Sequence, residues 1–313
     1  MKEKLIVGTR GSALALVQAE MTEALLRQSF PELEIVRKVI TTTGDRRTDV
    51  SLAQVAKVEG VFDKGVFIKE LEVALEAGEV DLAVHSLKDM PTVLDEGFEV
   101  VATLERAPVA DVLVTKQAGG LDALPIGAKV ASSSCRRQKM LRHLRPDIEM
   151  VDIRGNVPTR LRKLAENPDL DGILLAEAGL VRLGYDATGT MSTEAGDVFG
   201  QRVEPETFLP AAGQGAVALE VRSGDDRVRK FAEALNHAET MTRITAEREF
   251  LRLLNGGCHT PVGVATQLLG DKLMMEAIVF PEGEGVGVPM QAQVAGAADQ
   301  PLLVAETLFK SLS

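Results

Sequence analysis

Arginine occurs at three junctions where a predicted buried strand runs through a short polar loop into a predicted helix. The segments are Ile6-Val7-Gly8-Thr9-Arg10-Gly11-Ser12, Ala131-Ser132-Ser133-Ser134-Cys135-Arg136-Arg137 and Val151-Asp152-Ile153-Arg154-Gly155-Asn156. The chain as a whole is acidic, with a net charge of -11. Because a helix N-terminus offers unpaired N–H groups and a partial positive charge, the three junctions together predict a binding site for a small anion. Any one of these arginines alone is also explained as a solvated surface charge.

The second junction carries the densest set of donors. Ser133 and Ser134 supply hydroxyl groups just before a predicted helix, 135–144, and Arg136 and Arg137 lie in its first turn. The helix dipole disfavours cations there, so a compensating anion is expected. Each charge-assisted hydrogen bond to a bound carboxylate contributes about 1.5–3 kcal/mol.

The third junction places two more arginines on a predicted strand and helix. Arg154 ends the strand, and Arg160 lies one turn into the next helix. In an open α/β sheet, ligands bind at the carboxyl ends of the strands. Both side chains are therefore candidates for the same anion site.

A fourth strand–loop junction carries Lys88 and Asp89 in a turn that ends at Pro91. A carboxylate at such a position can stabilise a cationic intermediate or move protons. A charge pair at ~4 Å with an effective dielectric constant of ~20 is worth about 4 kcal/mol. The alternative for Asp89 is an ordinary turn aspartate, since turns favour this residue. His85, inside the preceding apolar strand, is interpreted as a hydrogen-bonded core histidine.

Cys258 follows two glycines, Gly256 and Gly257, after a long predicted helix. An exposed thiol on such a loop is a nucleophile or an attachment point, whereas the alternative is a small buried residue. The only other cysteine is Cys135, so neither a disulfide framework nor a metal-ligand spacing is present, and no metal is expected.

Composition excludes several classes of partner. The chain of 313 residues has no Trp and one Tyr, so an aromatic stacking surface for nucleic acid is not expected. No signal peptide and no apolar run of about 18 residues is visible, which predicts a cytoplasmic protein without a membrane partner.

Alternating strand and helix patterns predict an α/β fold with largely parallel sheets, followed by a smaller α+β region. We expect a discontinuous first domain (1–105 and 215–235), a second domain (109–209) and a third domain (237–313) that carries Cys258. The Gly-rich stretch 184–202 is expected to form a surface loop.

Taken together, these motifs resemble those of the porphobilinogen deaminase (hydroxymethylbilane synthase) family. The carriers are Thr9-Arg10-Gly11-Ser12, Lys69-Glu70-Leu71-Glu72, His85-Ser86-Leu87-Lys88-Asp89-Met90-Pro91, Ser133-Ser134-Cys135-Arg136-Arg137-Gln138, Arg154-Gly155-Asn156-Val157, Leu209-Pro210-Ala211-Ala212-Gly213-Gln214-Gly215-Ala216 and Gly256-Gly257-Cys258. The resemblance covers essentially the whole chain, with the motifs in the family's order. One departure is the longer and less Gly-rich loop Lys57–Gly65.

The resemblance implies two domains like periplasmic binding proteins of type II, plus the smaller C-terminal domain. It implies a monomeric transferase of tetrapyrrole (haem) biosynthesis that joins four porphobilinogen molecules into hydroxymethylbilane and releases ammonia. A dipyrromethane cofactor, bound covalently to a cysteine, primes the chain.

The same resemblance implies roles for individual residues. Asp89, with Lys88, matches the catalytic position, where the carboxylate would stabilise the cation left by loss of ammonia. The substrate-carboxylate positions correspond to Arg10, Arg154, Arg160 and Arg182. The cofactor-binding positions correspond to Cys258, Arg136, Arg137, Ser133, Ser134 and Gln214. Two other hypotheses are an anion-binding clamp without chemistry and a ligand-sensing regulator; neither needs a tethered thiol, and the regulator also needs a DNA-binding helix-turn-helix motif.

Overall fold

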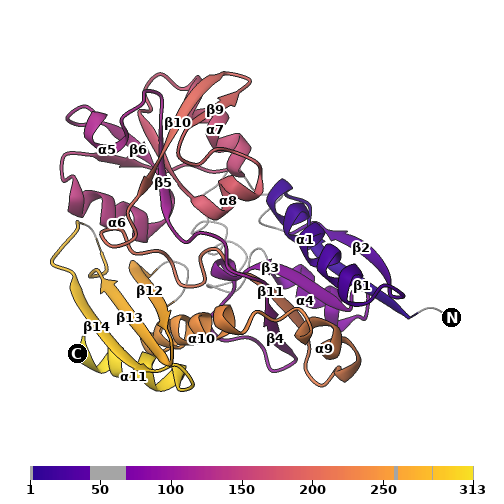
Figure 1. Cartoon of the computed structure of the whole chain (residues 1–313). Coiled ribbons are helices and arrows are strands. Elements are labelled where there is room, and N and C mark those ends of the chain that lie inside the picture. Colours follow the sequence, from indigo (N-terminus) through magenta and orange to yellow (C-terminus); the bar gives the residue numbers. More distant parts are fainter. Residues whose placement is uncertain (1–2, 43–67, 257–259, 284, 313) are drawn as a thin grey trace. The chain divides into compact units, whose positions relative to one another are not determined.

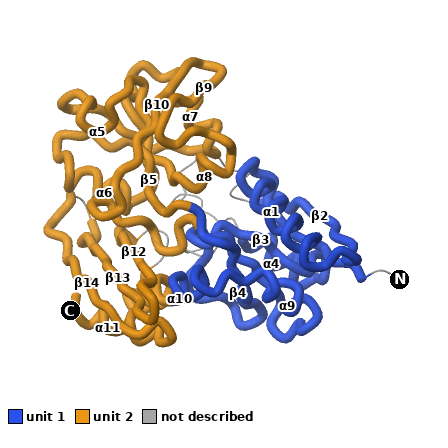
Figure 2. Tube along the Cα trace, in the orientation of Figure 1, with its two compact units in different colours: residues 1–107, 216–245 blue, residues 108–215, 246–313 orange. Residues whose placement is uncertain are grey.

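The computed structural model describes residues 3–42, 68–256, 260–283 and 285–312 (Figure 1). The chain divides into two compact units, Met1–Ala107 with Ala216–Thr245 and Pro108–Gly215 with Ala246–Ser313 (Figure 2). Among the described residues, unit 1 contains one β-sheet and unit 2 contains two, and each unit is described separately.

Unit 1 contains a five-stranded sheet in the order β2-β1-β3-β11-β4. The strands are β1 (Lys4–Arg10), β2 (Glu34–Ile40), β3 (Leu82–Ser86), β4 (Phe98–Thr103) and β11 (Val217–Arg222). Strands β1, β2 and β3 are parallel, whereas β11 runs antiparallel to β3 and β4. Its helices are α1 (Ala13–Ser29), α4 (Lys69–Glu76), the short 3-10 helix η1 (Leu87–Asp89) and α9 (Asp226–Glu233).

The parallel pairing of β1 with β3 decides where the first and fourth junctions lie. Val7 pairs with Leu82 and Gly8 with Ala83, so both strands end at the same edge of the sheet. Apolar side chains of these strands, such as Leu5 and Val84, are buried in the core of unit 1. Burial of that face leaves the polar residues that follow each strand at the carboxyl edge.

Unit 2 contains a six-stranded sheet in the order β7-β6-β8-β5-β10-β9. The strands are β5 (Asp111–Thr115), β6 (Lys129–Ala131), β7 (Glu149–Val151), β8 (Gly172–Ala176), β9 (Thr190–Thr193) and β10 (Gly196–Val203). Strands β6, β7 and β8 are parallel, and β5 runs antiparallel to β8. Its helices α5 (Gly120–Ala123), α6 (Cys135–Leu144), α7 (Val157–Glu166) and α8 (Glu177–Arg182) lie in the same unit.

The expected surface loop over 184–202 is wrong. Residues of this stretch form the hairpin β9–β10, and β10 extends the sheet by pairing with β5. Few side chains of these strands are buried, Met191 in β9 and Val198 and Val203 in β10, so the apolar pattern of a strand is weak here. Glycine is favoured at position 200 of β10 because a Cβ there would lie 2.4 Å from the carbonyl oxygen of Ala187.

The C-terminal part is an antiparallel sheet, β12-β13-β14, with its own hydrophobic core. Its elements are β12 (Val262–Leu269), β13 (Lys272–Val279), β14 (Met290–Ala297) and α11 (Pro301–Ser311), and α10 (Ala238–Leu253) precedes them. A tight turn joins β12 to β13, since Leu269 pairs with Lys272 and Gly270 has φ +63°. The predicted fold class, two α/β sheets followed by a smaller α+β region, is confirmed by these strand orders.

Within the described part of the chain, no helix is long and apolar enough to cross a bilayer. The same residues contain no group of three or more His, Cys, Asp or Glu side chains that would hold a metal ion.

Candidate active site

A pocket lies in unit 1 at the edge where β1 and β3 end. Polar side chains from β1, α1 and the segment after β3 line it together with apolar neighbours. The lining residues are Arg10, Ser12, Leu14, Ala15, Gln18, Ile68, Val84, His85, Ser86 and Asp89. The structure thus brings a predicted carboxylate-binding cation, Arg10, and the predicted catalytic carboxylate, Asp89, into one pocket.

Local backbone structure explains how the pocket is held. The Ser12 side chain caps α1 by accepting a hydrogen bond from the Ala15 N–H at 3.3 Å. Lys88 and Asp89 lie in the 3-10 turn between two buried apolar residues, Leu87 and Met90. These two apolar anchors fix the turn, so the half-buried carboxylate of Asp89 is presented at the pocket.

Gln18 and Ser86 also line the pocket, and the motif analysis assigned them no role. The Gln18 amide nitrogen donates to the Ser86 hydroxyl oxygen at 2.8 Å. Gln18 is only 2% exposed and belongs to the buried face of α1, with Ala15 and Ala19. A glutamine at a core position of an amphipathic helix was the available signal, because a buried amide needs hydrogen-bond partners.

His85 is a hydrogen-bonded core residue, as predicted. Its side chain is almost fully buried, and its Nε2 lies 2.8 Å from Oε2 of the buried Glu220 on β11. This contact links β3 to β11 at the residue before Ser86, which leads into the turn that carries Asp89.

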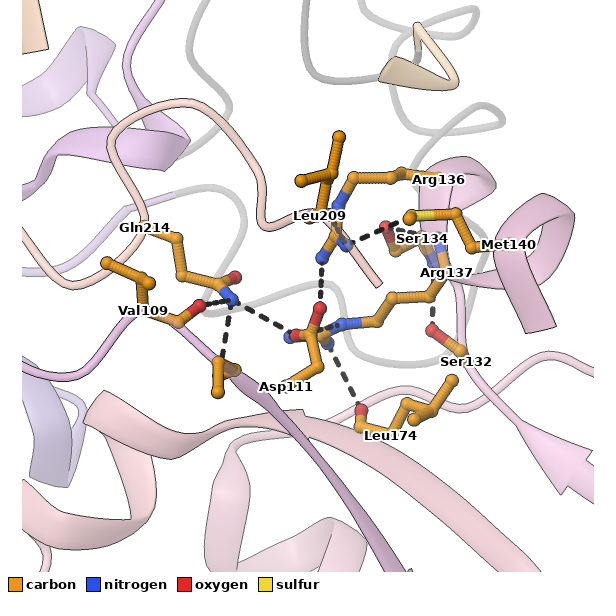
Figure 3. A network of polar contacts seen from close by, with 11 residues as sticks. Val109, Asp111, Ser132, Ser134, Arg136, Arg137, Met140, Leu174, Leu209 and Gln214 are labelled. Carbon is orange, nitrogen blue, oxygen red and sulfur yellow. Dashed lines mark hydrogen bonds and ion pairs between the residues drawn. The ribbon is translucent and has the colours of Figure 1, made fainter. Parts of the chain in front are cut away.

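In unit 2 a buried carboxylate, Asp111, contacts both arginines of the second junction (Figure 3). Its Oδ2 accepts a hydrogen bond from Arg136 Nη2 at 2.7 Å. Its Oδ1 accepts from Arg137 Nε at 2.8 Å and Nη2 at 2.6 Å. Asp111 is 0% exposed, and the two arginines are 4% and 6% exposed.

The direction of β5 explains this contact. Because β5 is antiparallel to β8, its first residue, Asp111, pairs with Ala176 at the end of β8. The start of β5 therefore lies at the edge where β6 ends and α6 begins. Sequence analysis missed Asp111; the signal was a carboxylate opening an otherwise apolar strand.

The remaining predicted cofactor contacts lie around this network. The Gln214 amide nitrogen donates to the Val109 carbonyl at 2.7 Å and to Asp111 Oδ1 at 3.1 Å (Figure 3). Ser134 caps α6, and the Ser133 hydroxyl donates to the Ile153 carbonyl at 2.8 Å. The structure thus brings Arg136, Arg137 and Gln214 together on one carboxylate, while the two serines hold the adjacent backbone.

Arg182 differs from this pair because no carboxylate of the described residues forms an ion pair with it. It is the last residue of α8, the helix that directly follows β8. Its Nη2 donates to the Gly215 carbonyl at 2.7 Å. Its Nε is buried and has no partner among the described residues. Burial lowers the pKa of Arg182 to about 10 because the charged guanidinium loses hydration.

Arg154 and Arg160 lie at the carboxyl edge of the same sheet, after β7. Arg160 Nε donates to the Gly155 carbonyl at 2.7 Å. Burial lowers the pKa of Arg154, and the nearby Asp152 carboxylate opposes this shift. Since β7, β6 and β8 are parallel neighbours, the structure brings the arginines after all three strands to one edge of unit 2.

The predicted cofactor cysteine, Cys258, and the loop 57–65 lie outside the described residues. The elements on either side of Cys258, α10 and β12, are described.

Nearly the whole chain is similar to members of one protein family. Residues 5–230 match the family model "Porphobilinogen deaminase, dipyromethane cofactor binding domain", and residues 241–310 match "Porphobilinogen deaminase, C-terminal domain". The porphobilinogen deaminase of Roseiflexus sp. (strain RS-1) is 42% identical over 302 residues, covering 96% of this chain and 93% of that protein. The porphobilinogen deaminase of Xanthomonas campestris pv. campestris is 43% identical over 308 residues, covering 98% of this chain and 96% of that protein.

Among solved structures, the methionine-binding protein MetQ is similar with a TM-score of 0.43 and 12% sequence identity, covering 78% of this chain and 96% of that protein. The family models match most of the chain, and the two relatives match it over nearly their full length. The chain belongs to the porphobilinogen deaminase family.

Proposed function

We propose that this chain condenses four porphobilinogen molecules into the linear tetrapyrrole hydroxymethylbilane, with release of ammonia. The observation that carries the proposal is the pocket of unit 1, which contains both the Arg10 guanidinium and the Asp89 carboxylate. Porphobilinogen has the matching chemistry, because it carries acetate and propionate groups and becomes cationic when ammonia leaves.

Asp89 acts on the reacting pyrrole in this proposal. Its carboxylate hydrogen-bonds the pyrrole N–H, stabilises the cation formed on loss of ammonia and transfers protons, and Lys88 beside it supports this step. Stabilising a developing charge in this way is usually a large contribution to catalysis. The turn between the buried Leu87 and Met90 holds the carboxylate in position.

Arg10, Arg154, Arg160 and Arg182 bind substrate carboxylates. Arg182 has the strongest support, because its buried guanidinium has an unused Nε–H and a lowered pKa. A carboxylate at this position would supply the missing counter-charge. Arginine suits the role, since its planar group binds carboxylate through two parallel hydrogen bonds.

The residues of unit 2 also fit a dipyrromethane cofactor, which carries carboxylates of the same kind. Arg136 Nε is a second buried donor without a partner among the described residues. Arg136, Arg137, Ser133, Ser134 and Gln214 would hold the cofactor, and the Cys258 sulfur would tether it as a thioether. When bound, this group supplies the pyrrole to which the first substrate molecule is joined.

We also propose that the enzyme works as a cytoplasmic monomer. The dipyrromethane site and the substrate site are assigned to residues of one chain, so no second copy is needed. Light scattering coupled to size-exclusion chromatography tests the monomer, and cell fractionation tests the location.

Intact mass spectrometry of the purified protein, together with an assay of porphobilinogen turnover, tests the function. We expect extra mass equal to two pyrrole units, which disappears in Cys258→Ser but is kept in the matched variant Cys135→Ser. Turnover of porphobilinogen should be lost in Cys258→Ser, which lacks the extra mass, and kept in Cys135→Ser. A wild-type chain that binds porphobilinogen, gains no mass and releases no product would support the anion-binding clamp instead.

A further inference from the structure

Asp111 lies at the centre of the polar network of unit 2, and no role for it follows from the motifs. Both of its carboxylate oxygens are used by guanidinium groups, at 2.7 Å from Arg136 and at 2.6 and 2.8 Å from Arg137. The side chain is 0% exposed. This contact therefore fixes the direction in which each guanidinium points.

The charges of the three side chains do not cancel. Two guanidinium cations and one carboxylate leave one positive charge among three nearly fully buried groups. An uncompensated buried charge is costly, so a further anion is favoured beside the pair. Burial lowers the pKa of Arg136, Asp111 opposes this shift, and the like charge of Arg137 adds to it.

One donor of the pair is available for such an anion. Arg136 Nη1 donates to the Leu209 carbonyl at 2.7 Å, and Arg137 Nη1 donates to the Leu174 carbonyl at 3.1 Å. Arg136 Nε is buried and has no hydrogen-bond partner among the described residues. The ring of Phe208, with its centroid 5.7 Å from Arg136, does not replace a carboxylate.

We infer that Asp111 is a positioning residue of the reaction, a resident carboxylate that orients Arg136 and Arg137 and cancels one of their two charges. The pair then takes up one carboxylate of the tethered dipyrromethane. This inference rests on the proposed function, since it assigns the pair to the cofactor. The Gln214 amide, which also donates to Asp111, extends the same arrangement to the segment Gly213–Gly215.

Variants of the full-length chain that remove charges from this cluster test the inference. Arg137→Gln leaves the cluster with no net charge, and Asp111→Asn combined with Arg137→Gln returns it to one positive charge. The amide oxygen introduced by Asp111→Asn can still accept the hydrogen bond from Arg136 Nη2, so this guanidinium keeps its direction while the charge changes. After incubation with porphobilinogen, intact mass spectrometry measures the fraction of chains that carry the tethered dipyrromethane. We expect the loaded fraction of Arg137→Gln to be about tenfold lower than that of wild type. The loaded fraction of the double variant should be at least about threefold higher than that of Arg137→Gln.

A matched control changes the total charge of the chain without touching the cluster. Asp147→Asn, at an exposed ion pair with Arg145, combined with Arg137→Gln should load no better than Arg137→Gln alone. If Asp111 had only a structural role, the Asp111→Asn/Arg137→Gln variant would load less well than Arg137→Gln, because a second substitution in a buried network would lower loading further.

Three outcomes separate the possibilities. If wild type gains no mass, the proposed function fails. If wild type loads but the Asp111→Asn/Arg137→Gln variant loads no better than Arg137→Gln, the inference about Asp111 is wrong and the function stands. Circular dichroism checks folding, and a double variant that unfolds where Arg137→Gln folds also overturns the inference, because the charge balance has been restored.

Discussion

Gln18 and Ser86 are joined by a hydrogen bond of 2.8 Å that connects α1 to the end of β3. Ser86 immediately precedes the turn that carries Asp89, and Gln18 is 2% exposed. The position of the proposed catalytic carboxylate therefore depends on a helix that lies far from it in the sequence. Both side chains line the same pocket as Arg10 and Asp89.

A double-mutant cycle tests this connection. Ser86→Ala leaves the buried Gln18 amide without a partner, which should cost about 1–3 kcal/mol of unfolding free energy. We expect the cycle with Gln18→Leu to give a coupling of about 1 kcal/mol in urea denaturation. Turnover should fall about ten- to a hundredfold in either single variant because the turn is less well positioned. Additive effects on stability would show that the bond contributes nothing.

Substitution of Asp89 should separate catalysis from binding. Asp89→Asn keeps the shape of the side chain and removes its charge, so turnover should fall about a thousandfold. The melting temperature should stay close to that of wild type, since the side chain is half-buried at a pocket. Asp95→Asn, an exposed aspartate in the following loop, is the control and should turn over normally. Product release by Asp89→Asn near the wild-type rate would show that the Asp89 carboxylate is not catalytic.

Arg182 should show opposite effects on stability and on substrate affinity. Its lowered pKa, about 10, means that its buried charge costs stability at every pH below that value, and the cost disappears only as the pH rises above it. Arg182→Met should therefore be at least as stable as wild type at pH 7, while KM for porphobilinogen rises about ten- to a hundredfold.

Arg202→Met is the matched control for Arg182, because it removes an arginine that has an acidic partner. Arg202 pairs with the buried Glu177, so its loss leaves that carboxylate unpaired. We expect a loss of about 1–3 kcal/mol in unfolding free energy and little change in KM. If Arg182→Met is destabilised as much as this control, its charge is compensated in the free protein.

The lowered pKa of Glu23 predicts that unit 1 loses part of its stability at acid pH. Burial alone would raise its pKa, but hydrogen bonds from Arg37 at 2.5 Å and Arg27 at 3.0 Å outweigh burial and lower the pKa below its usual value. A lowered carboxylate pKa stabilises the fold above the ordinary glutamate range, and the contribution is lost as the pH falls through the lowered value. Glu23→Gln should therefore be less stable than wild type at pH 7, with the difference shrinking on acidification.

Urea denaturation at a series of pH values measures this effect, and Glu76→Gln, an exposed glutamate at the end of α4, is the control. A constant difference between Glu23→Gln and wild type from neutral to acid pH contradicts the assignment.

Much of the architecture was predictable because it depends on local patterns. Alternating apolar segments, turn residues and caps such as Ser12 and Ser134 mark strands and helices along the chain. The hairpin β9–β10 was not predicted because few of its side chains are buried and glycine weakens the strand pattern. It was also predictable that arginines following parallel strands lie at one edge of the sheet, since the carboxyl ends of such strands share an edge.

By itself, the sequence determined which residue types follow each strand, and therefore that cations and one carboxylate would gather at sheet edges. Only the tertiary structure decided which partners they meet there. Asp111 reaches Arg136 and Arg137 because β5 is inserted antiparallel beside β8, and Gln18 reaches Ser86 because α1 packs next to β3. Strand order and direction are set by burial of the whole sheet, so no local pattern around either residue contains that information.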